Sequence, residues 1–563
     1  MPDPIRERIT AELTAADGMF PIVEEEVRGR LLPVLAQRRR SLLDFMGAAA
    51  GHGDSEFLVH DDRRITHADF ADLVAAEAHV LATEHRVGPG DRVAILAANS
   101  PDWVIAYFAT LSLGAIAAAY NGWWTPDEIG AATELTTPAL ILGDEKRLAR
   151  VPAGLGTRVV DFEADRDRLL GEAGRHALPS VEIAEDDPAT IFFTSGTTGR
   201  AKGATASHRG LVGFVEVQFL NGAIRAFTAA EEAERRGEEP AAMARPRNRV
   251  LATSPLFHVS GLSASILLNM AAGGTLVFRS GRFDPGALLE VVERERITTW
   301  TLLGSMGPRV LEHTDLATTD LSSVTNVGFG GAPVSPDIQQ RVRDAFPNAA
   351  ANVGIGYGSS ETVSVVASHG GRDLEERPEA TGWIMPTVEV QIRDDDGTPL
   401  PDGVNGHIWV LSAYTMLGYW DDPDATAEAV DDDGWLNTGD IGRMEDGVLT
   451  IDSRARDLIL RNADNIYPTE VEYRLEDHPA VAEVAVYGID HPEMGQEVAA
   501  SVVPTADATL TEDELAAFVA ASLAAYKVPS TWDIRTEPLP RNAAGKVVKS
   551  VLTGERDLDQ HED

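Results

Sequence analysis

The chain has 563 residues, 44% of them hydrophobic, so it can bury a large core and should form two or three domains. Its 48 Lys and Arg against 89 Asp and Glu give a net charge of −41, which argues against nucleic acid and anionic membranes as general partners. The absence of cysteine excludes a disulfide framework, a thiolate metal site and a cysteine nucleophile, so any thiol in the chemistry must belong to the substrate.

The N-terminal part and the apolar runs predict a soluble, cytoplasmic protein without a membrane span. The N-terminus has no signal-peptide pattern. The longest mostly apolar run, residues 105–120, is too short for a comfortable span and predicts a buried helix. Residues up to about Arg40 have a charged, helical pattern, and Arg38-Arg39-Arg40 is interpreted as a solvated helix face.

Strands that alternate with helices predict an α/β architecture with largely parallel sheet up to about residue 350. The predicted elements are a hairpin over 56–60 and 64–66, a helix from 68, a strand over 91–96 and a helix opened by Asn99-Ser100-Pro101. The charged stretch 229–249 is predicted to be an exposed insertion. After residue 385, short strands and turns predict a β-rich segment; after about 454 a small α+β unit follows, with a strand over 481–486 and a helix over 511–525.

The stretch 189–203, A-T-I-F-F-T-S-G-T-T-G-R-A-K-G, predicts a phosphate-binding loop. A buried strand runs into hydroxyls and glycines, and a lysine follows. Glycines let backbone N–H groups approach an anion, hydroxyls donate hydrogen bonds, and lysine adds a mobile positive charge. The candidate ligands are Thr194, Ser195, Gly196, Thr197, Thr198, Gly199 and Lys202. The spacing differs from the G-x-x-x-x-G-K-[ST] loop of common NTPases, and a polar hairpin turn is the alternative interpretation.

Further motifs carry groups that can bind a nucleotide or act on it. They are P-L-F-H at 255–258, G-G-A-P at 330–333, G-Y-G-S-S-E at 356–361, G-W-L-N-T-G-D at 434–440 and P-R-N-A-A-G-K at 540–546. An adenine can stack on Tyr357, Glu361 can hold Mg²⁺, and Asp440 can accept ribose hydroxyls. Taken singly, most of these motifs are better explained as a core histidine, a tight turn, a core tyrosine, a turn acid and a solvated lysine.

Jointly, and in this order, the motifs resemble those of the adenylate-forming (AMP-binding) superfamily, specifically its acyl-CoA synthetases and fatty-acid–CoA ligases. The matching strings, which include S-R-A-R-D at 453–457 and N-I-Y-P-T-E-V-E at 465–472, span Thr194 to Lys546, and with the flanking architecture they cover nearly the full chain. The resemblance implies an AMP-forming acid–thiol ligase that uses ATP, Mg²⁺ and CoA. Such an enzyme couples a carboxylic acid, here fatty or aryl, to ATP, releases pyrophosphate and passes the acyl group to CoA.

The resemblance also implies a role for each matching residue. Lys546 would reach the substrate carboxylate and the α-phosphate, Glu361 would bind Mg²⁺, and His258 would stand as a gate beside the acyl pocket. The ATP-binding set would add to the phosphate loop Gly330, Gly331, Ala332, Pro333, Tyr357, Gly358, Ser359, Ser360, Asp440 and Arg454. Arg456 matches the hinge position, about which relatives rotate their C-terminal domain between the two half-reactions.

The expected fold class is α/β, with a large N-terminal domain of sheets flanked by helices plus a β-rich subdomain, and a small mobile α+β C-terminal domain. We place an N-terminal AMP-binding and acyl-substrate domain at residues 1–454 and a C-terminal mobile AMP-binding domain at 455–563. The expected partners are a small carboxylic acid, ATP and CoA, with no nucleic acid; a homodimer stays open.

Three points limit what the resemblance implies. Asn462 and Ala463 stand where relatives commonly carry glycines along the pantetheine path, so a carrier protein, an amine or another acceptor remains an alternative to CoA, as does an unusual oxyacid substrate. No aspartate lies near Phe257-His258 to pair with an ammonium group, which weighs against an amino acid substrate. A binding protein of the same fold without catalysis is disfavoured by the intact Lys546, Glu361 and Lys202.

Overall fold

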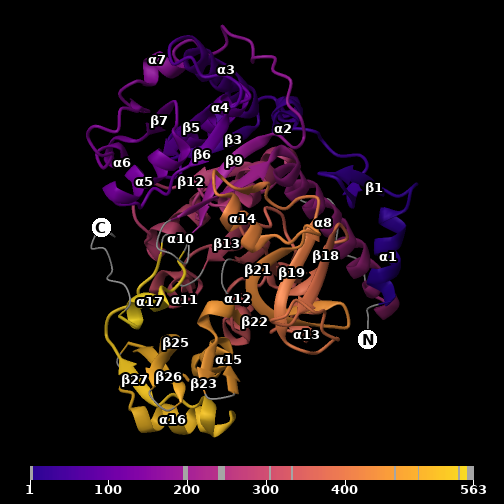
Figure 1. Ribbon diagram of the computed structural model, residues 1–563, viewed down its shortest axis with the longest axis vertical. Helices are drawn as coiled ribbons and strands as arrows, with labels where there is room; N and C mark the ends of the chain where they lie inside the picture. Colours follow the sequence, from indigo (N-terminus) through magenta and orange to yellow (C-terminus); the bar gives the residue numbers. More distant parts are fainter. Residues whose placement is uncertain are drawn as a thin grey trace.

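The structure is a computed structural model that describes residues 4–194, 201–238, 247–303, 306–330, 334–461, 464–491, 494–506, 508–542 and 545–554. Within these residues the strands form four sheets. Figure 1 shows three of them stacked along the long axis, with the C-terminal part at one end of the molecule. The fold is α/β with a β-rich segment and a small α+β C-terminal part.

Each sheet is named here for its place in the chain. The hairpin sheet is β1 (Ile22–Val27) and β2 (Arg30–Leu35). The N-terminal sheet has the order β20 (Gly418–Tyr419), β10 (Lys202–Ser207), β9 (Pro188–Thr194), β6 (Ile116–Ala119), β5 (Arg92–Leu96), β7 (Leu140–Gly143) and β8 (Arg158–Asp161).

The remaining two sheets hold most of the later strands. The long sheet has the order β18 (Val388–Arg393), β19 (Gly406–Ser412), β21 (Leu436–Glu445), β22 (Val448–Arg454), β17 (Gly382–Ile384), β16 (Ala367–Gly370), β15 (Val353–Tyr357), β14 (Asn326–Gly330), β13 (Thr299–Leu303), β11 (Arg249–Leu251), β12 (Thr275–Phe278), β3 (Glu56–His60) and β4 (Arg63–Thr66). The C-terminal sheet has the order β24 (Asp464–Ile466), β23 (Ile459–Arg461), β26 (Gly495–Pro504) and β25 (Val481–His491), and β27 (Thr531–Ile534) pairs with β26.

Helices cover the faces of the sheets. The α-helices of the described residues are α1 (Pro4–Thr14), α2 (Leu42–Ala49), α3 (His67–Thr83), α4 (Pro101–Leu111), α5 (Pro126–Thr136), α6 (Glu145–Leu148), α7 (Arg166–Leu170), α8 (His208–Arg236), α9 (Leu268–Ala272), α10 (Pro285–Arg294), α11 (Met306–Leu311), α12 (Pro336–Ala345), α13 (Arg372–Glu376), α14 (Pro423–Ala429), α15 (Pro468–Glu476), α16 (Glu512–Ala520) and α17 (Lys549–Leu552). None of the described helices is long and apolar enough to cross a membrane.

The N-terminal sheet confirms the predicted parallel α/β core. β5 pairs in parallel with β6 and β7, and β6 pairs in parallel with β9. All residues of β6 are buried, as expected for a parallel strand covered on both faces. The predicted opening of α4 is also confirmed, because Ser100 Oγ accepts a hydrogen bond from Trp103 N–H and Pro101 occupies the first turn. The predicted hairpin of β3 and β4 is present.

The N-terminal segment differs from the predicted helix. Helix α1 ends at Thr14, and β1 and β2 then pair as an antiparallel hairpin whose turn, Arg28-Gly29, has positive φ values of 50° and 80°. The run of three glutamates in β1 lacks the alternation on which strand prediction rests. The assignment of Arg38 to a solvated helix face was also wrong, because Arg38 is buried and pairs with Glu25 and Glu185.

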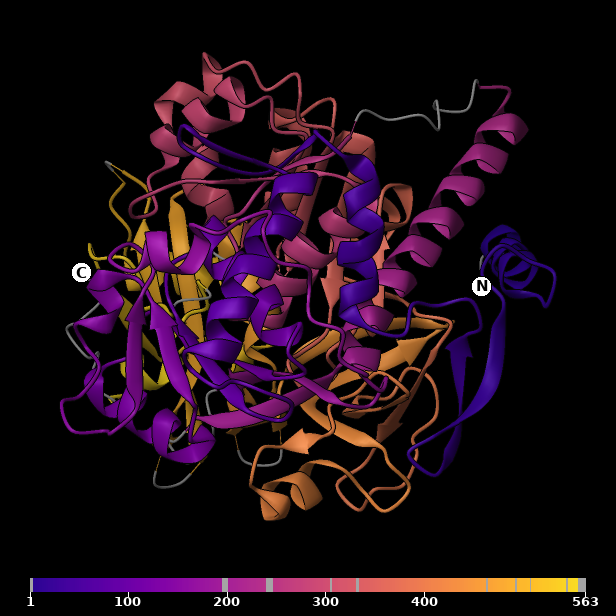
Figure 2. The same cartoon turned by 90° about the horizontal axis from the view of Figure 1, so that it is seen from above.

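One other prediction is corrected, and a second becomes more specific. The apolar run 105–120 is not one buried helix: α4 ends at Leu111, Gly114 turns the chain with a φ of 68°, and β6 follows. The charged stretch 229–249 begins as helix, because α8 continues to Arg236, and residues 234–238 are exposed as predicted; residues 239–246 lie outside the described residues. Figure 2 shows the end of α8 projecting from the body with α1 beside it, and Arg8 of α1 pairs with Glu231.

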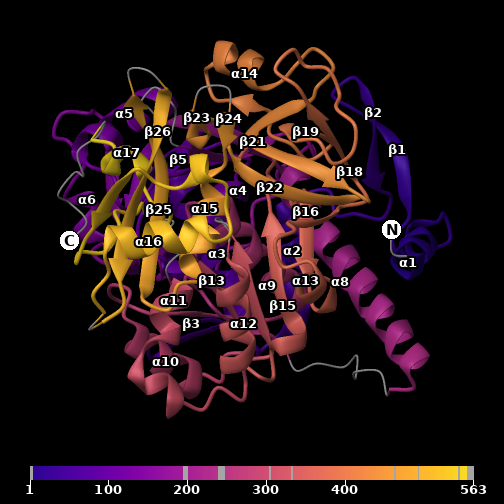
Figure 3. The same cartoon turned by 90° about the horizontal axis from the view of Figure 1, so that it is seen from below.

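The C-terminal sheet has its own hydrophobic core. Buried residues of β23, β25, β26, α15 and α16 pack together, including Ile459, Val486 and Leu515. Each buried Val, Leu or Ile side chain stabilises a fold by about 1.5–3 kcal/mol, so this part can hold its own structure. The predicted strand and helix are present as β25 and α16, the latter capped by Thr511. Helix α15 contacts β22 of the long sheet, and Figure 3 shows the C-terminal part against the strands of that sheet.

Candidate active site

Three side chains on strands of the long sheet form a hydrogen-bonded group. Tyr357 ends β15, while Asp440 and Arg454 are register partners on β21 and β22. The Tyr357 hydroxyl donates to Asp440 Oδ2 over 2.7 Å, and Arg454 Nε lies 3.2 Å from Asp440 Oδ1. Burial and the Asp440 carboxylate raise the pKa of Tyr357, so its phenol stays protonated and remains a donor. Each carboxylate oxygen keeps a further lone pair, with which Asp440 can accept hydroxyl groups.

Glycines leave open space beside this group. Gly330 and Gly356 are register partners at the ends of β14 and β15. Among the described residues, a Cβ added at Gly356 would meet no atom within 4 Å, and one added at Gly330 would meet only the Gly356 carbonyl oxygen, at 4.0 Å. A flat ring can therefore lie against the backbone at the ends of these two strands. Gly331, Ala332 and Pro333 lie outside the described residues.

The loop that follows Tyr357 is fixed by reciprocal hydrogen bonds. Ser359 N–H donates to Thr362 Oγ1 over 2.8 Å, and Thr362 N–H donates to Ser359 Oγ over 3.2 Å. A Cβ at Gly358 would come within 2.8 Å of the Ser364 carbonyl oxygen, so only glycine fits without a shift. Ser360 is half-buried in the same loop. These contacts hold the backbone that presents the next residue, Glu361.

Glu361 and Lys202 meet at the ring of Tyr419. The Tyr419 hydroxyl donates to Glu361 Oε1 over 3.1 Å, and Lys202 Nζ lies 5.1 Å from the ring centroid, in the range of a cation–π contact. Lys202 begins β10 and pairs in register with Thr194 at the end of β9. Ser195, Gly196, Thr197, Thr198 and Gly199 lie outside the described residues. The start of β10 and the loop after β15 therefore bring a lysine and a carboxylate to one place.

The donor set fits Mg²⁺ held together with phosphate oxygens. The described residues contain no group of three His, Cys, Asp or Glu side chains that could form a protein metal cage. Mg²⁺ is usually bound by one or two carboxylates plus substrate phosphates, and it keeps several waters. Glu361 is the carboxylate available here, and its Oε1 is oriented by Tyr419. When bound, the ion would neutralise phosphate charge.

Lys546 comes from the C-terminal part and faces this site. It closes a turn in which its N–H donates to Asn542 Oδ1 over 3.0 Å, and Gly545 has a φ of 76°. Burial and the positive charge of Arg454 lower the pKa of Lys546 to about 8, while the carboxylates of Asp440 and Glu361 oppose the shift. The lysine therefore interacts electrostatically with the residues of the nucleoside and metal positions.

His258 is close enough to Lys546 to feel its charge. Burial, with a smaller effect of the Lys546 charge, lowers the pKa of His258 to about 4, so the imidazole is neutral at physiological pH. Its ring contacts that of Phe257 with centroids 4.7 Å apart. The π-helix Gly261–Leu267 follows, and π-helical turns often occur at functional sites. His258 is therefore a neutral side chain within electrostatic reach of Lys546.

Arg456 is set apart from the nucleotide contacts. It lies in the 3₁₀ turn Ala455–Asp457 directly after β22, its side chain is 52% exposed, and its Nε is 3.7 Å from Asp457 Oδ1. Its charge still contributes to lowering the pKa of Lys546. Asn462 and Ala463, which bear on the choice of acceptor, lie outside the described residues.

The motif series did not indicate Tyr419 or the segment that carries it. Tyr419 follows Gly418 in β20, a two-residue strand on the edge of the N-terminal sheet. An aromatic residue after a glycine is too common to single out, and its two contacts depend on partners far away in the chain. Only the three-dimensional arrangement reveals it.

Comparison with known proteins places the chain in a family. A family model described as AMP-binding enzyme matches residues 45–420, and one described as AMP-binding enzyme C-terminal domain matches residues 470–546. The chain is 32% identical to a feruloyl-CoA synthase of Amycolatopsis sp over 508 residues, which cover 87% of this chain and 94% of the relative. It is also 32% identical to 3-[(3aS,4S,7aS)-7a-methyl-1,5-dioxo-octahydro-1H-inden-4-yl]propanoyl:CoA ligase of Rhodococcus jostii (strain RHA1), with 90% and 97% covered.

A solved structure agrees with this placement. The amide bond synthetase McbA from Marinactinospora thermotolerans has a TM-score of 0.77 and 29% sequence identity, and the match covers 92% of this chain and 100% of that one. The chain therefore belongs to the AMP-binding enzyme family. It is an adenylate-forming acid–thiol ligase of the acyl-CoA synthetase type, which activates a carboxylic acid with ATP and transfers the acyl group to CoA, with Mg²⁺ as cofactor.

Proposed function

We propose that the acid is a ring-bearing carboxylic acid rather than a simple fatty acid. Two relatives that cover most of the chain are named for acids that contain rings, one aromatic and one bicyclic. The chain lacks an aspartate beside Phe257-His258, which disfavours an amino acid.

The same site supports a role for each candidate residue. In this proposal Tyr357 holds adenine against the backbone of Gly330 and Gly356. Asp440 and Arg454 hold the ribose, and Glu361 holds Mg²⁺. Thr194, Lys202 and the loop between them cradle the phosphates. Negative charge accumulates on the oxygens of the α-phosphate while the carboxylate attacks it and pyrophosphate leaves, and a positioned cation stabilises this charge. The observations that carry this proposal are the hydrogen-bonded group of Tyr357, Asp440 and Arg454 and the meeting of Glu361 and Lys202 at Tyr419.

The test is ATP-dependent pyrophosphate release against a panel of aryl, alicyclic and straight-chain acids, each with and without CoA. We expect release with ring-bearing acids and a CoA thioester as product. Faster turnover of straight-chain acids would contradict the substrate class. Lys546→Ala serves as the control, because it should abolish adenylate formation yet largely spare thiolysis of a supplied acyl-adenylate.

An amine acceptor is the second candidate. The likeness to an amide bond synthetase at 29% identity favours it as the alternative. Adding amines to the panel in place of CoA decides between them: an amide without a thioester would move the assignment to amide synthesis, and a thioester that forms faster than any amide would keep CoA as the acceptor.

Three wider expectations are proposed with the function. We place the domain boundary at 454/455, with Arg456 as the hinge, because β22 ends at Arg454 and a separate core begins at Ile459.

A cytoplasmic location is proposed because ATP and CoA are the co-substrates. The homodimer is tested by light scattering, where a mass near 60.4 kDa would exclude it.

A further inference from the structure

The segment 413–420 supports the metal carboxylate and the phosphate lysine together. Met416 N–H donates to the Glu361 carbonyl oxygen over 2.8 Å, and Tyr419 bonds the Glu361 side chain. The same segment pairs with β10, since Trp420 N–H donates to the Gly203 carbonyl oxygen over 2.7 Å, one residue after Lys202. Segment 413–420 therefore joins the edge of the N-terminal sheet to the loop that presents Glu361.

The hairpin sheet binds segment 413–420 through hydrogen bonds from Arg28. Arg28 Nη1 donates to the carbonyl oxygens of Met416, over 3.0 Å, and Thr415, over 3.3 Å. Arg28 Nη2 donates to the Ala413 carbonyl oxygen and to Thr415 Oγ1, each over 3.3 Å. Met416 is thus held on both sides, its carbonyl by Arg28 and its N–H by Glu361. The rigid fork of a guanidinium suits several acceptors at once, which a lysine cannot reproduce.

Arg28 occupies a backbone conformation that its residue type rarely adopts. Its φ of 50° places it in the left-handed region at the turn of the hairpin. Such positions persist where surrounding contacts over-determine them, and they often serve function. On the opposite side, segment 413–420 packs tightly on α8, because a Cβ at Gly213 would lie 2.3 Å from the Tyr414 ring.

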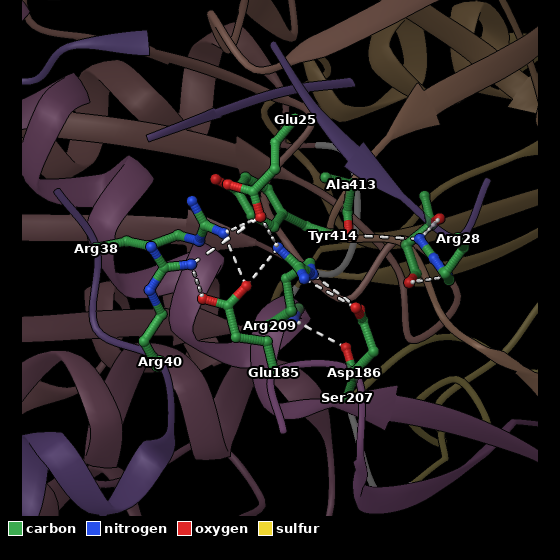
Figure 4. A network of polar contacts seen from close by, with 12 residues as sticks. Glu25, Arg28, Arg38, Arg40, Glu185, Asp186, Ser207, Arg209, Ala413 and Tyr414 are labelled. Atoms are coloured by element: carbon green, nitrogen blue, oxygen red, sulfur yellow. Dashed lines mark hydrogen bonds and ion pairs between the residues drawn. The ribbon is translucent and has the colours of Figure 1, made fainter. Parts of the chain in front are cut away.

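The base of the hairpin is tied to the strands of the phosphate loop (Figure 4). Arg38 bonds Glu25 of β1 over 2.8 Å and Glu185 over 2.7 Å. Arg209, at the start of α8, pairs with Glu185 and with Asp186 at 2.5 and 2.8 Å. Glu185 and Asp186 precede β9, so one network links the hairpin to both strands that flank the loop. The hairpin therefore holds β9, β10 and segment 413–420 in one arrangement.

We propose that Arg28 is a positioning residue for the metal site: through Met416 it fixes the backbone and side chain of Glu361 relative to Lys202. The inference rests on the proposed role of Glu361 as the Mg²⁺ ligand. Arg28 touches no substrate group, so its effect is confined to the half-reaction that uses Mg²⁺ and the triphosphate. Thiolysis of a preformed acyl-adenylate does not depend on it.

The experiment titrates Mg²⁺ in pyrophosphate release by the full-length enzyme and its Arg28→Ala and Arg28→Lys variants. We expect the apparent KM for Mg²⁺ to rise at least about fivefold in both, because hydrogen bonds from a charged donor are lost. Thiolysis of supplied acyl-adenylate should stay at the wild-type rate. The matched control is Arg30→Ala, since Arg30 lies on the same hairpin but donates to the Asp432 carbonyl oxygen, away from segment 413–420.

A purely structural role predicts a different pattern. It would lower kcat in both half-reactions and leave the KM for Mg²⁺ unchanged, and that result would overturn the proposal. Should Arg28→Ala not fold, Arg28→Lys gives the same comparison.

Tyr419→Phe removes the hydrogen bond to the Glu361 side chain. If Arg28 and Tyr419 both act on Glu361, the effects of Tyr419→Phe and Arg28→Lys on the KM for Mg²⁺ should be non-additive, and full additivity would count against the proposal.

The Glu361→Gln variant shows whether a negative result concerns the role of Arg28 or the proposed role of Glu361 as the metal ligand. If it raises the KM for Mg²⁺ while the Arg28 variants do not, the inference fails alone. If it leaves Mg²⁺ dependence unchanged, Glu361 is not the metal ligand and both assignments fail.

Discussion

At the scale of single residues, burial and nearby carboxylates act in opposite directions on the pKa of Lys546. Burial and Arg454 lower its pKa to about 8, and Asp440 and Glu361 limit the shift. With a pKa of about 8, Lys546 still carries its proton at pH 7. Its proposed role requires this, because the positive charge must be present when the phosphate oxygens gain negative charge. The enzyme therefore works close to the edge of the pH range in which this residue is charged.

The pH dependence of adenylation follows from this pKa. The pKa of Lys546 is lowered, so the free enzyme loses the positive charge as pH rises through about 8. We expect kcat/KM for ATP in pyrophosphate release to fall above that pH by about tenfold per unit, since this parameter reports the free enzyme. Thiolysis of supplied acyl-adenylate should lack this limb. An adenylation profile that stays flat to pH 10 would contradict the assignment.

Sequence alone singles out residues that stand in several specific motifs, and it misses residues whose importance comes from a single long-range contact. Tyr357, Asp440 and Lys546 stand in strings whose order is specific. Tyr419 and Arg28 stand in no such string, because their importance comes from hydrogen bonds to residues far along the chain. The contact of Tyr357 with Asp440 could not be read from the sequence either, although both residues were named.

At the scale of elements, the 3₁₀ turn after β22 is the proposed hinge. Proline at position 456 would fix φ near −65° and remove the freedom that a rotation needs. We expect Arg456→Pro to slow thiolysis more than adenylation, by roughly 100-fold if the second arrangement is misplaced by an ångström. Single-turnover rates of the two half-reactions measure this. Arg456→Ala keeps backbone freedom and should slow neither; equal losses in both variants would assign the effect to the side chain instead.

The elements that sequence patterns predicted share a local signal. Helix α4 has Ser100 and Pro101 at its start, and buried parallel strands such as β6 read as apolar runs. The hairpin of β1 and β2 has no such signal, because charged residues occupy consecutive positions of β1 and the turn is Arg28-Gly29. Its place in the fold is decided by the ion pairs of Arg38 and Arg209, which are tertiary.

At the scale of the whole molecule, the contact between the C-terminal part and the rest contains a buried acid. Glu476, on α15, has its pKa raised to about 7 by burial and by the charges of Glu472, Asp477 and Asp337, while Ser335 opposes the shift. Asp337 and Ser335 belong to the start of α12 in the N-terminal part. The arrangement that brings Lys546 to the site therefore favours the protonated form of Glu476.

The sign of the resulting pH effect is fixed. The folded pKa is above the ordinary 4.5, so this arrangement is favoured at low pH and loses stability as pH rises from 4.5 through about 7. The ratio of adenylation to thiolysis rates should fall across pH 5.5–7.5, by at most about tenfold per unit for one proton. Glu476→Gln should flatten this dependence. Wild-type and variant profiles of the same slope would contradict the role of Glu476.

The separation of the nucleotide contacts between two sheets has a consequence for motion. The proposed nucleoside residues lie on the long sheet and the proposed phosphate lysine, Lys202, on the N-terminal sheet, and Tyr419 of the N-terminal sheet donates to Glu361, which follows β15 of the long sheet. Adenosine would then engage one layer, whereas the triphosphate would couple both. Amide hydrogen exchange should accordingly slow in β15 and β21 with adenosine, and slow in β10 and β20 as well only when the phosphates are present. The bound triphosphate would therefore restrict the motion of the N-terminal sheet relative to the long sheet.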